Sequence, residues 1–291
     1  MTMDLALRRR FFAEEIEAVA RLRSRAVVDA LAAVPRERFL GPGPWTTLTD
    51  ADFAPGGLGP ARQTPDADPA RIYHNVGVAI DPTRQLFNGQ PAKLAPWIDA
   101  LAPAPGQRVL HVGAGTGYYT AVMANCVGRS GRVLALEADP TLADAARTNL
   151  VDMPHVEVRA DASGNPGGET FDVILVNAGV THPLDAWLDA LAAGGRLIVP
   201  LTATMGAMGP IGKGLVFLVA RDAGDGFAAK VTGFVTIYSA VGLRDEVMNA
   251  QLGKKLMAGP QQSGSVTRLR CDQHEPAASC WYHGPTFCFS A

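Results

Sequence analysis

The sequence has few of the features that mark secreted, membrane-spanning or nucleic-acid-binding proteins. It holds 4 cysteines in 291 residues, too few for a disulfide scaffold, so we expect reduced thiols and a cytoplasmic protein. No apolar run approaches the roughly 20 residues of a membrane helix, and residues 1–10 lack the apolar core of a secretory signal. The net charge of −2 offers no basic face to nucleic acid. We therefore expect neither a membrane nor a nucleic-acid partner.

A hydrophobic fraction of 47% is typical of a globular protein, and the apolar residues fall into recognisable periods. Helical spacing predicts one helix over 4–33, which Pro35 ends. Many glycines and prolines predict a long irregular segment over 41–70, of the kind that covers a site. Further along, the pattern predicts strands at 76–80, 108–112, 132–136, 156–159, 171–176 and 196–200. It predicts helices at 91–101, after a glycine-rich turn through 127, at 140–150 and at 183–192.

Strands that alternate with helices predict βαβ units and an α/β fold. Two further apolar runs, 215–220 and 231–238, predict antiparallel strands at one edge. We therefore predict a Rossmann-like fold with a mostly parallel sheet, an antiparallel edge, an N-terminal helical segment and a C-terminal extension. The expected domains are 1–104 for the helical and substrate-loop region, 105–240 for the cofactor-binding domain and 241–291 for the extension.

The strand at 108–112 runs into three alternating glycines, Gly113, Gly115 and Gly117, and then into a helix. Such a turn lets the backbone approach a ligand closely, and the helix start offers N–H groups to a carboxylate. A dinucleotide fingerprint has its third glycine one position later, where this chain has Tyr118. The G-x-G-x-G form suits S-adenosylmethionine, which has no phosphate, and we predict this cofactor.

Polar side chains follow the next strands. Glu137 lies 20 residues after Gly117, where a carboxylate can accept hydrogen bonds from both ribose hydroxyls. Asp161 is a candidate for the adenine amino group, with a helix cap or surface residue as the alternative. Asn177 ends a strand where open sheets place ligand contacts, with an ordinary turn residue as the alternative. The predicted cofactor site comprises His111, Gly113, Ala114, Gly115, Thr116, Gly117, Tyr118, Glu137, Ala138, Asp161, Ala162 and Asn177.

In this order the pieces resemble the protein-L-isoaspartate O-methyltransferase family over roughly residues 25–240. The resemblance implies cofactor contacts from Gly113, Gly115, Gly117, Glu137 and Asp161, and a carboxylate as methyl acceptor. The similar stretches are the Pro-Arg-Glu-x-Phe element in 34–39, the substrate loop 88–91, the cofactor motifs at 109–118, 136–138 and 143–150, and the stretches 171–174 and 191–200.

The chain departs from this family at three places. His111 stands where the family usually has an acidic residue that helps hold the methionine amino group of the cofactor; a neutral imidazole can still accept a hydrogen bond. Gly89 occupies the position of the substrate-loop serine, and residues 241–291 extend beyond a typical member. We therefore favour a divergent relative with its own substrate.

An ionised carboxylate is already a nucleophile, so alignment rather than a general base would drive methyl transfer. His74, Asn88 and Gln90 are the predicted acceptor-side residues, with a surface or structural histidine as the alternative for His74. The leading function is an S-adenosylmethionine-dependent O-methyltransferase of an aspartyl or isoaspartyl carboxylate in a peptide or protein. Methylation of a small-molecule hydroxyl or amine, and a non-catalytic cofactor-binding module, are the alternatives. Nothing in the sequence indicates an oligomeric state.

The tail contains Cys271-x-x-His274 and Cys280-x-x-His283, followed by Cys288. Such pairs are compatible with zinc-ligand spacing. Aromatic residues lie among them, however, and a buried cysteine often acts as a small hydrophobe. We therefore expect no metal, and a tail that packs on the core or shapes the substrate site.

Overall fold

The computed structural model describes residues 4–49, 52–54, 57–58, 61–204, 209–224, 226–259 and 263–291. The chain forms two compact units, each assembled from separate stretches of sequence. The first comprises Met1–Gly106, Ala114–Ala135 and Asp139–Val158, and the second Gln107–Gly113, Leu136–Ala138 and Arg159–Ala291. The three domains expected from sequence stay a prediction. Among the described residues, no helix has the length and hydrophobicity needed to cross a bilayer.

The first unit opens with two helices, α1 (Leu5–Ala20) and α2 (Arg25–Ala33), so the single helix predicted over 4–33 is wrong. Arg21 adopts a left-handed φ of 53° and ends α1. The Ser24 hydroxyl then accepts a hydrogen bond from the Val27 amide and caps α2. Apolar residues keep helical spacing on both sides of this break, which is why the periodicity does not reveal it.

The prediction of an irregular segment over 41–70 is wrong in part. A four-stranded sheet of order β4-β1-β5-β6 has antiparallel neighbours throughout. A separate antiparallel pair joins β2 to β3. Residues 50–51, 55–56 and 59–60 of the segment lie outside the described residues. The strands concerned are β1 (Thr46–Leu48), β2 (Phe53–Ala54), β3 (Gly57–Leu58), β4 (Arg62–Gln63), β5 (Gly77–Asp81) and β6 (Leu86–Asn88), and β5 confirms the strand predicted at 76–80.

The alternation predicted after residue 105 is confirmed. The strands are β7 (Arg108–Val112), β8 (Arg132–Glu137), β9 (Val156–Ala160), β10 (Phe171–Val176), β11 (Leu191–Ala203), β12 (Ile211–Arg221) and β13 (Phe227–Tyr238). The helices are α3 (Pro91–Leu101), α4 (Tyr118–Val127), α5 (Pro140–Asn149) and α6 (Asp185–Ala190). The helix predicted over 183–192 is shorter than expected, because β11 already begins at Leu191.

The main sheet has the strand order β15-β16-β14-β13-β12-β11-β10-β7-β8-β9, in which β14 is Arg268–Arg270, β15 is Cys280–His283 and β16 is Cys288–Ser290. Strand β10 pairs in parallel with β7 and β11, whereas β12 and β13 are antiparallel additions, as predicted. Leaving β7, the chain builds β8 and β9 on one side and β10 and β11 on the other. The strand order therefore reverses at β7, and open α/β sheets bind ligands at such a switch point.

The strands around this point are apolar because they are buried. Val109, Leu110, Ile174 and Leu175 are all fully buried. A strand covered on both faces has no solvent side to keep polar, so it appears in the sequence as a continuous apolar run rather than an alternation.

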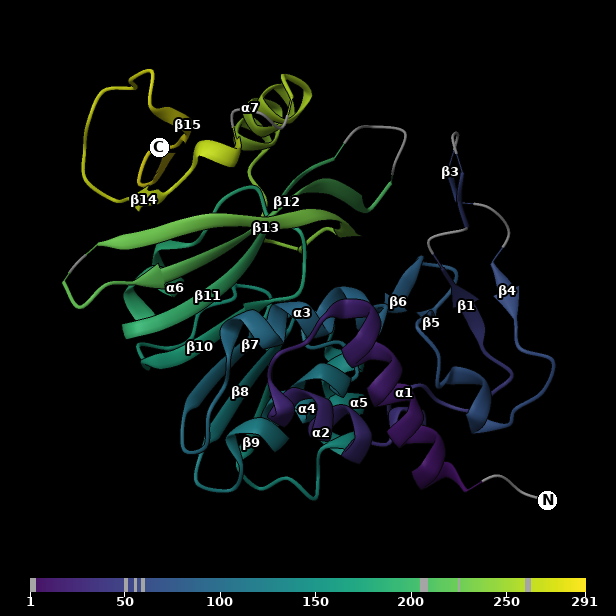
Figure 1. Cartoon of the computed structure of the whole chain (residues 1–291). Helices are drawn as coiled ribbons and strands as arrows, with labels where there is room; N and C mark the ends of the chain where they lie inside the picture. The colour runs from purple at the N-terminus through teal and green to yellow at the C-terminus, as the bar shows by residue number, and fades with distance from the viewer. Residues whose placement is uncertain are drawn as a thin grey trace. The chain divides into compact units, whose positions relative to one another are not determined.

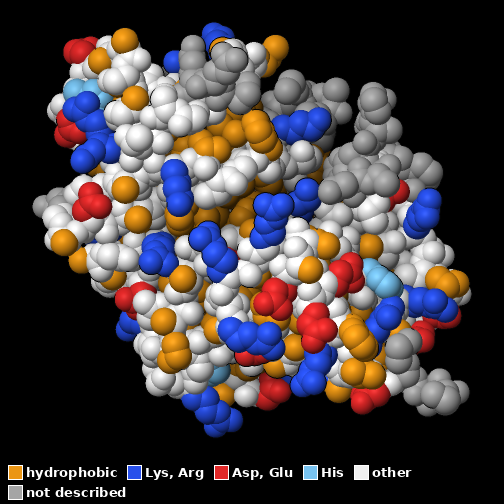
Figure 2. All heavy atoms as spheres, viewed as in Figure 1, with side chains coloured by type: hydrophobic (Ala, Val, Ile, Leu, Met, Phe, Trp, Pro, Cys, Tyr) orange, Lys and Arg blue, Asp and Glu red, His pale blue; other side chains and the backbone are white. Residues whose placement is uncertain are grey.

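The C-terminal residues extend the sheet beyond β13 (Figure 1, yellow). Phe289 is fully buried, with its ring centroid 4.5 Å from that of Phe217 on β12, so the expected packing of the tail on the core is confirmed. Figure 2 shows Lys and Arg side chains interspersed with Asp and Glu on the face it presents, in keeping with the small net charge. The C-terminal elements are α7 (Glu246–Met257), β14 (Arg268–Arg270), β15 (Cys280–His283) and β16 (Cys288–Ser290).

Candidate functional site

The loop from β7 to α4 has a backbone that requires glycine. Gly113 and Gly117 adopt φ values of 80° and 97°, in the left-handed region. A Cβ on Gly113 would lie 3.3 Å from the main chain of Asn177, and one on Gly117 only 2.9 Å from Leu150 Cδ1. Gly117 is also the N-cap of α4 and contributes no side-chain hydrogen bond to the helix start. The loop therefore presents main chain rather than side chains.

Two predicted cofactor residues in this loop, Thr116 and Tyr118, belong to the first unit and pack their side chains within it. The Thr116 hydroxyl donates a 2.7 Å hydrogen bond to the carbonyl of Phe39. The Tyr118 side chain is buried, with its ring 5.7 Å from that of Phe39 and beneath the Arg36 guanidinium. Any contact of these two residues with a cofactor would therefore come from their main chain. Phe39 and Arg36 belong to the Pro-Arg-Glu-x-Phe element, which supports the glycine loop.

In the second unit, main-chain hydrogen bonds join the ends of four strands. The Asn177 amide donates to the Val112 carbonyl at 2.8 Å, and the Gly113 amide to the Leu136 carbonyl at 2.9 Å. The Asp161 amide donates to the Glu137 carbonyl at 2.8 Å. This row brings together four predicted cofactor residues at the carboxyl ends of the strands, namely Gly113, Glu137, Asp161 and Asn177.

The two carboxylates of this row differ in their surroundings. Glu137 is 8% exposed. Oδ1 of Asp161 accepts hydrogen bonds from the Ser163 amide and hydroxyl, both at 2.6 Å, and from the Gly164 amide at 3.2 Å. Asp161 thus shapes its own loop, and Ala162 follows it in that loop. Trp187 Nε1 holds the far end by donating to the Gly164 carbonyl at 2.8 Å.

His111, on β7, is fully buried. Burial lowers the pKa of His111 to about 3, because an imidazolium is poorly solvated in the interior. The ring is therefore neutral at physiological pH. A neutral imidazole at this position agrees with the expectation from sequence, and it provides no negative charge for an ammonium group.

Arg36 organises the segment of the first unit that carries the predicted acceptor-side residues, and sequence reasoning gave it no role. Its guanidinium is fully buried and donates to the carbonyls of Ile72 and Val76 at 2.8 and 2.7 Å. It also donates to the His74 carbonyl at 3.3 Å and to Asn88 Oδ1 at 3.2 Å. The Arg36 guanidinium thus fixes the path of the chain before β5 and orients the Asn88 side chain at the end of β6. The sequence signal available for Arg36 was its position in the Pro-Arg-Glu-x-Phe element.

The three predicted acceptor-side residues belong to the first unit but differ in exposure. Asn88 is buried, with its oxygen on Arg36, so its Nδ2 group is the part left for a ligand. Gln90 is the N-cap of α3 and makes no side-chain capping bond. His74 is exposed, and its Nε2 lies 3.0 Å from Arg8 Nη2. Partial burial and the Arg8 charge both lower the pKa of His74, so its ring is neutral.

Gly89, at the position of the family's serine, is enclosed by its neighbours. The Tyr119 hydroxyl donates a 2.7 Å hydrogen bond to the Gly89 carbonyl. A Cβ on this glycine would lie 2.7 Å from Leu94 Cδ2, so a serine requires Leu94 to move. The departure from the family at Gly89 is therefore matched by the packing around it.

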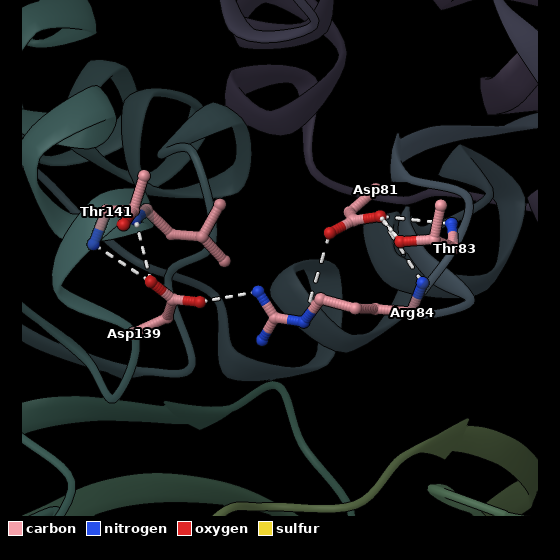
Figure 3. Close-up of polar contacts among 6 residues, drawn as sticks. Asp81, Thr83, Arg84, Asp139 and Thr141 are labelled. Atoms are coloured by element: carbon pink, nitrogen blue, oxygen red, sulfur yellow. Dashed lines mark hydrogen bonds and ion pairs between the residues drawn. The ribbon is translucent and has the colours of Figure 1, made fainter.

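A polar bridge links the β5–β6 turn to the start of α5 (Figure 3). Arg84 Nη1 lies 2.6 Å from Asp139 Oδ2, and the other oxygen of Asp139 caps α5 by accepting from the Thr141 amide at 2.9 Å. Asp81 Oδ1 accepts from the Thr83 amide and hydroxyl, which shapes the turn that presents Arg84. The hydrogen bond from Arg84 lowers the pKa of Asp139, so this carboxyl is ionised. Sequence reasoning missed the bridge.

Comparison with known proteins places this geometry in a family. The family model for protein-L-isoaspartate(D-aspartate) O-methyltransferase matches residues 67–210. The protein-L-isoaspartate O-methyltransferase of Methylorubrum populi is 32% identical over 235 residues, which cover 78% of this chain and 94% of that protein. The enzyme of the same name from Methanopyrus kandleri is 30% identical over 197 residues, or 65% and 74% of the two chains.

Solved structures agree on the fold. A protein-L-isoaspartate O-methyltransferase aligns with a TM-score of 0.61 at 22% identity, over 84% of this chain and 69% of that one. A Plasmodium falciparum structure of the same description, in complex with S-adenosyl-L-homocysteine, gives 0.59 at 17% identity, over 80% and 97%. The sequence relatives and the family model concur: the chain belongs to the protein-L-isoaspartate O-methyltransferase family of S-adenosylmethionine-dependent enzymes.

Proposed function

We propose that this enzyme transfers the methyl group of S-adenosylmethionine to an aspartyl or isoaspartyl carboxylate of a peptide or protein. The observation that carries the proposal is the row of hydrogen-bonded strand ends that brings Gly113, Glu137, Asp161 and Asn177 together. Relatives that cover most of the chain are named for this reaction, and they supply the substrate class.

The residues present suit the cofactor. Gly113 and Gly117 have no side chain, and the space that a Cβ would need is taken by Asn177 and Leu150, so the loop presents main-chain groups that can contact the methionine part. Glu137, which is nearly buried, is the proposed acceptor for the ribose hydroxyls, and a dry carboxylate binds hydroxyls strongly. Asp161 Oδ2 and the Ala162 main chain are proposed for the adenine. Main-chain groups of Ala114, Gly115, Thr116, Tyr118 and Ala138, with the side chains of His111 and Asn177, complete the proposed set.

When bound, S-adenosylmethionine supplies an electrophilic methyl group on a sulfonium sulfur. An acceptor carboxylate oxygen forms the new C–O bond as the C–S bond breaks, and the electron pair of that bond stays on sulfur. No proton is transferred, so the protein must align the acceptor and exclude water, which is worth up to about 7–11 kcal/mol for well-oriented reactants. We assign the alignment to Asn88 Nδ2 and Gln90, with His74 as a neutral polar neighbour.

The proposal is tested by two separate measurements. Calorimetry with S-adenosylhomocysteine measures the cofactor site alone. Transfer of labelled methyl groups to matched isoaspartyl and aspartyl peptides then measures the acceptor. Carboxyl methyl esters release methanol in mild base, whereas methylated amines and hydroxyls do not, so base-labile label supports the proposal. Base-stable label on a small molecule would replace it with the small-molecule alternative, and tight cofactor binding without turnover on any acceptor would support the non-catalytic one.

We also propose that the enzyme works in the cytoplasm. None of its four cysteines forms a disulfide in the structure, which suits a reducing compartment.

A further inference from the structure

Four potential metal ligands meet in the C-terminal tail. One ligand atom from each of His274, Cys280, His283 and Cys288 lies within 4.8 Å of all the others. Cys271, which the sequence pairs with His274, is exposed and is not part of this cluster. The tertiary structure therefore selects a set that the two Cys-x-x-His pairs do not specify.

A β-bulge places the ligands on one face of the hairpin. Cys280 is opposite Ser290, whereas Tyr282 is opposite Phe289, so one extra residue is inserted between them on β15. In a regular strand, residues three apart point to opposite faces. The extra residue restores Cys280 to the face of His283, which is opposite Cys288 on β16.

The His274 ring is oriented as zinc-binding histidines are. Its Nδ1 lies 2.9 Å from the carbonyl oxygen of Asp272 and 3.5 Å from that residue's carboxylate. This leaves Nε2 directed at Cys280 Sγ, at 3.6 Å. Metal-ligating histidines usually donate their other N–H to a carbonyl or carboxylate, which fixes the ring and its tautomer.

Two further features of the cluster suit a thiolate and a bound cation. The Ala277 amide donates to Cys280 Sγ at 3.3 Å, an interaction that stabilises a negatively charged sulfur. His283 Nδ1 is buried and has no hydrogen-bond partner among the residues that the structure describes. A buried, unsatisfied ring nitrogen requires an explanation, and an ion is one of the few available.

From this geometry we propose that the tail binds one zinc ion through His274, Cys280, His283 and Cys288. Zinc takes four ligands in a tetrahedron, with Zn–S near 2.3 Å and Zn–N near 2.0–2.1 Å, so its ligand atoms lie roughly 3.3–3.8 Å apart. The observed separations, all within 4.8 Å, need only a small contraction. Two soft thiolates and two imidazoles favour zinc over magnesium or calcium. Two thiolates also neutralise the divalent charge.

Four protein ligands leave no position open for water or substrate, so the proposed site is structural. It closes the β15–β16 hairpin, whose Phe289 packs against Phe217. The Tyr282 hydroxyl anchors the hairpin by donating to the Thr181 and Met248 carbonyls at 2.8 and 3.2 Å. Zinc would thus fix the final strands of the sheet. His274, Cys280 and His283 are each partly exposed, so a chelator can reach the cluster.

The test uses full-length protein expressed with added zinc and purified without a metal-affinity tag. Elemental analysis is expected to give one equivalent of zinc per chain. The variants Cys280→Ser and His283→Asn should lose it, whereas the matched control Cys271→Ser should keep it. If the variants fail to fold, wild-type protein stripped by a chelator and reloaded with Co²⁺ should show thiolate-to-cobalt charge transfer and tetrahedral d–d absorption.

Three outcomes would overturn the site. The first is wild-type protein that holds reduced thiols but neither retains zinc nor acquires a tetrahedral cobalt spectrum. The second is zinc that persists in both Cys280→Ser and His283→Asn. The third is a Cys280–Cys288 disulfide found by mass spectrometry in protein prepared under reducing conditions. None of these measurements involves methyl transfer, so they are independent of the proposed function.

Discussion

Arg84 and Asp139 form an ion pair with Nη1 and Oδ2 2.6 Å apart, although 55 residues separate them in the chain (Figure 3). Asp139 begins α5 two residues after Glu137, and Arg84 lies in the turn before Asn88. One contact thus joins the hairpin that carries Asn88, a proposed acceptor-side residue, to the helix that follows Glu137, the proposed ribose ligand.

The Arg84–Asp139 pair should contribute more to the position of the β5–β6 hairpin than to the free energy of unfolding. Arg84 is 43% exposed, so Arg84→Gln should cost only about 0.2–1 kcal/mol in urea unfolding. Asp139→Ala also removes the cap of α5 and should cost about 1–2 kcal/mol in total. Because Arg84 lowers the pKa of Asp139, this contribution is present at neutral pH and is lost as the pH falls through that pKa. Arg84→Gln should also raise the KM for the acceptor several-fold.

Arg25→Gln is the control for this prediction. Arg25 forms a 2.9 Å pair with Asp29, but both side chains are exposed. The Arg25→Gln variant should change neither the free energy of unfolding nor the KM for the acceptor. An Arg84→Gln enzyme with unchanged KM would show that the bridge does not position the hairpin.

Removing the charge of Glu137 should weaken cofactor binding specifically. A hydrogen bond to a charged group is worth about 1.5–3 kcal/mol, so Glu137→Gln should raise the Kd for S-adenosylhomocysteine roughly 10- to 150-fold. Glu157→Gln is the matched control, because Glu157 is 41% exposed and pairs with Arg132 at 2.6 Å. Equal affinities in calorimetry for the two variants would refute the role of Glu137.

The glycine loop should tolerate no side chain at Gly117. Gly117→Ala combines a left-handed φ of 97° with a Cβ 2.9 Å from Leu150, so it should cost about 1–3 kcal/mol and weaken cofactor binding. Gly168→Ala isolates the backbone effect, since Gly168 has a φ of 79° and nothing within 4 Å of its Cβ. Thermal unfolding of both variants separates the cost of backbone strain from the cost of the collision with Leu150. Equal losses of stability in the two variants would mean that Leu150 moves aside at no measurable cost.

Arg36 should be essential to the first unit. Arg36→Met leaves the carbonyls of Ile72 and Val76 without their buried donor, and such losses cost about 3–5 kcal/mol when a buried charged network is broken. The exposed pair Arg38–Asp152 provides a control, because Arg38→Gln should cost at most about 1 kcal/mol. Denaturant unfolding measures both, and a small loss for Arg36→Met would contradict a central role for the guanidinium.

His111 predicts a pH dependence of stability. Its pKa is lowered to about 3 in the folded protein, against about 6.5 in the unfolded chain, so the unfolded state takes up a proton first as the pH falls. The His111 contribution is therefore full above about pH 6.5, and stability falls by up to about 1.4 kcal/mol per pH unit below it. His111→Asn should flatten this slope between pH 6.5 and pH 5, whatever its effect at pH 7. If the unfolding free energies of wild type and His111→Asn change with pH in parallel, His111 is not the group that causes this pH dependence.

Local pattern was sufficient for the elements between residues 91 and 176. The predicted bounds of α3, β7 and β10 match the structure, because an apolar run and the glycines or prolines beside it are local signals. It failed between residues 4 and 70. There, Arg21 and Ser24 interrupt a continuous helical spacing, and the strands contain only two or three residues.

The sequence by itself determined the α/β alternation, the glycine loop and the family, because these depend on residue types at short, ordered spacings. Only the tertiary structure decided that Arg36 reaches three carbonyls, that Arg84 meets Asp139, and that a bulge turns Cys280 toward His283. These contacts depend on how strands and turns orient side chains across long separations. A change of one residue in strand register reverses that orientation, and no local spacing encodes it.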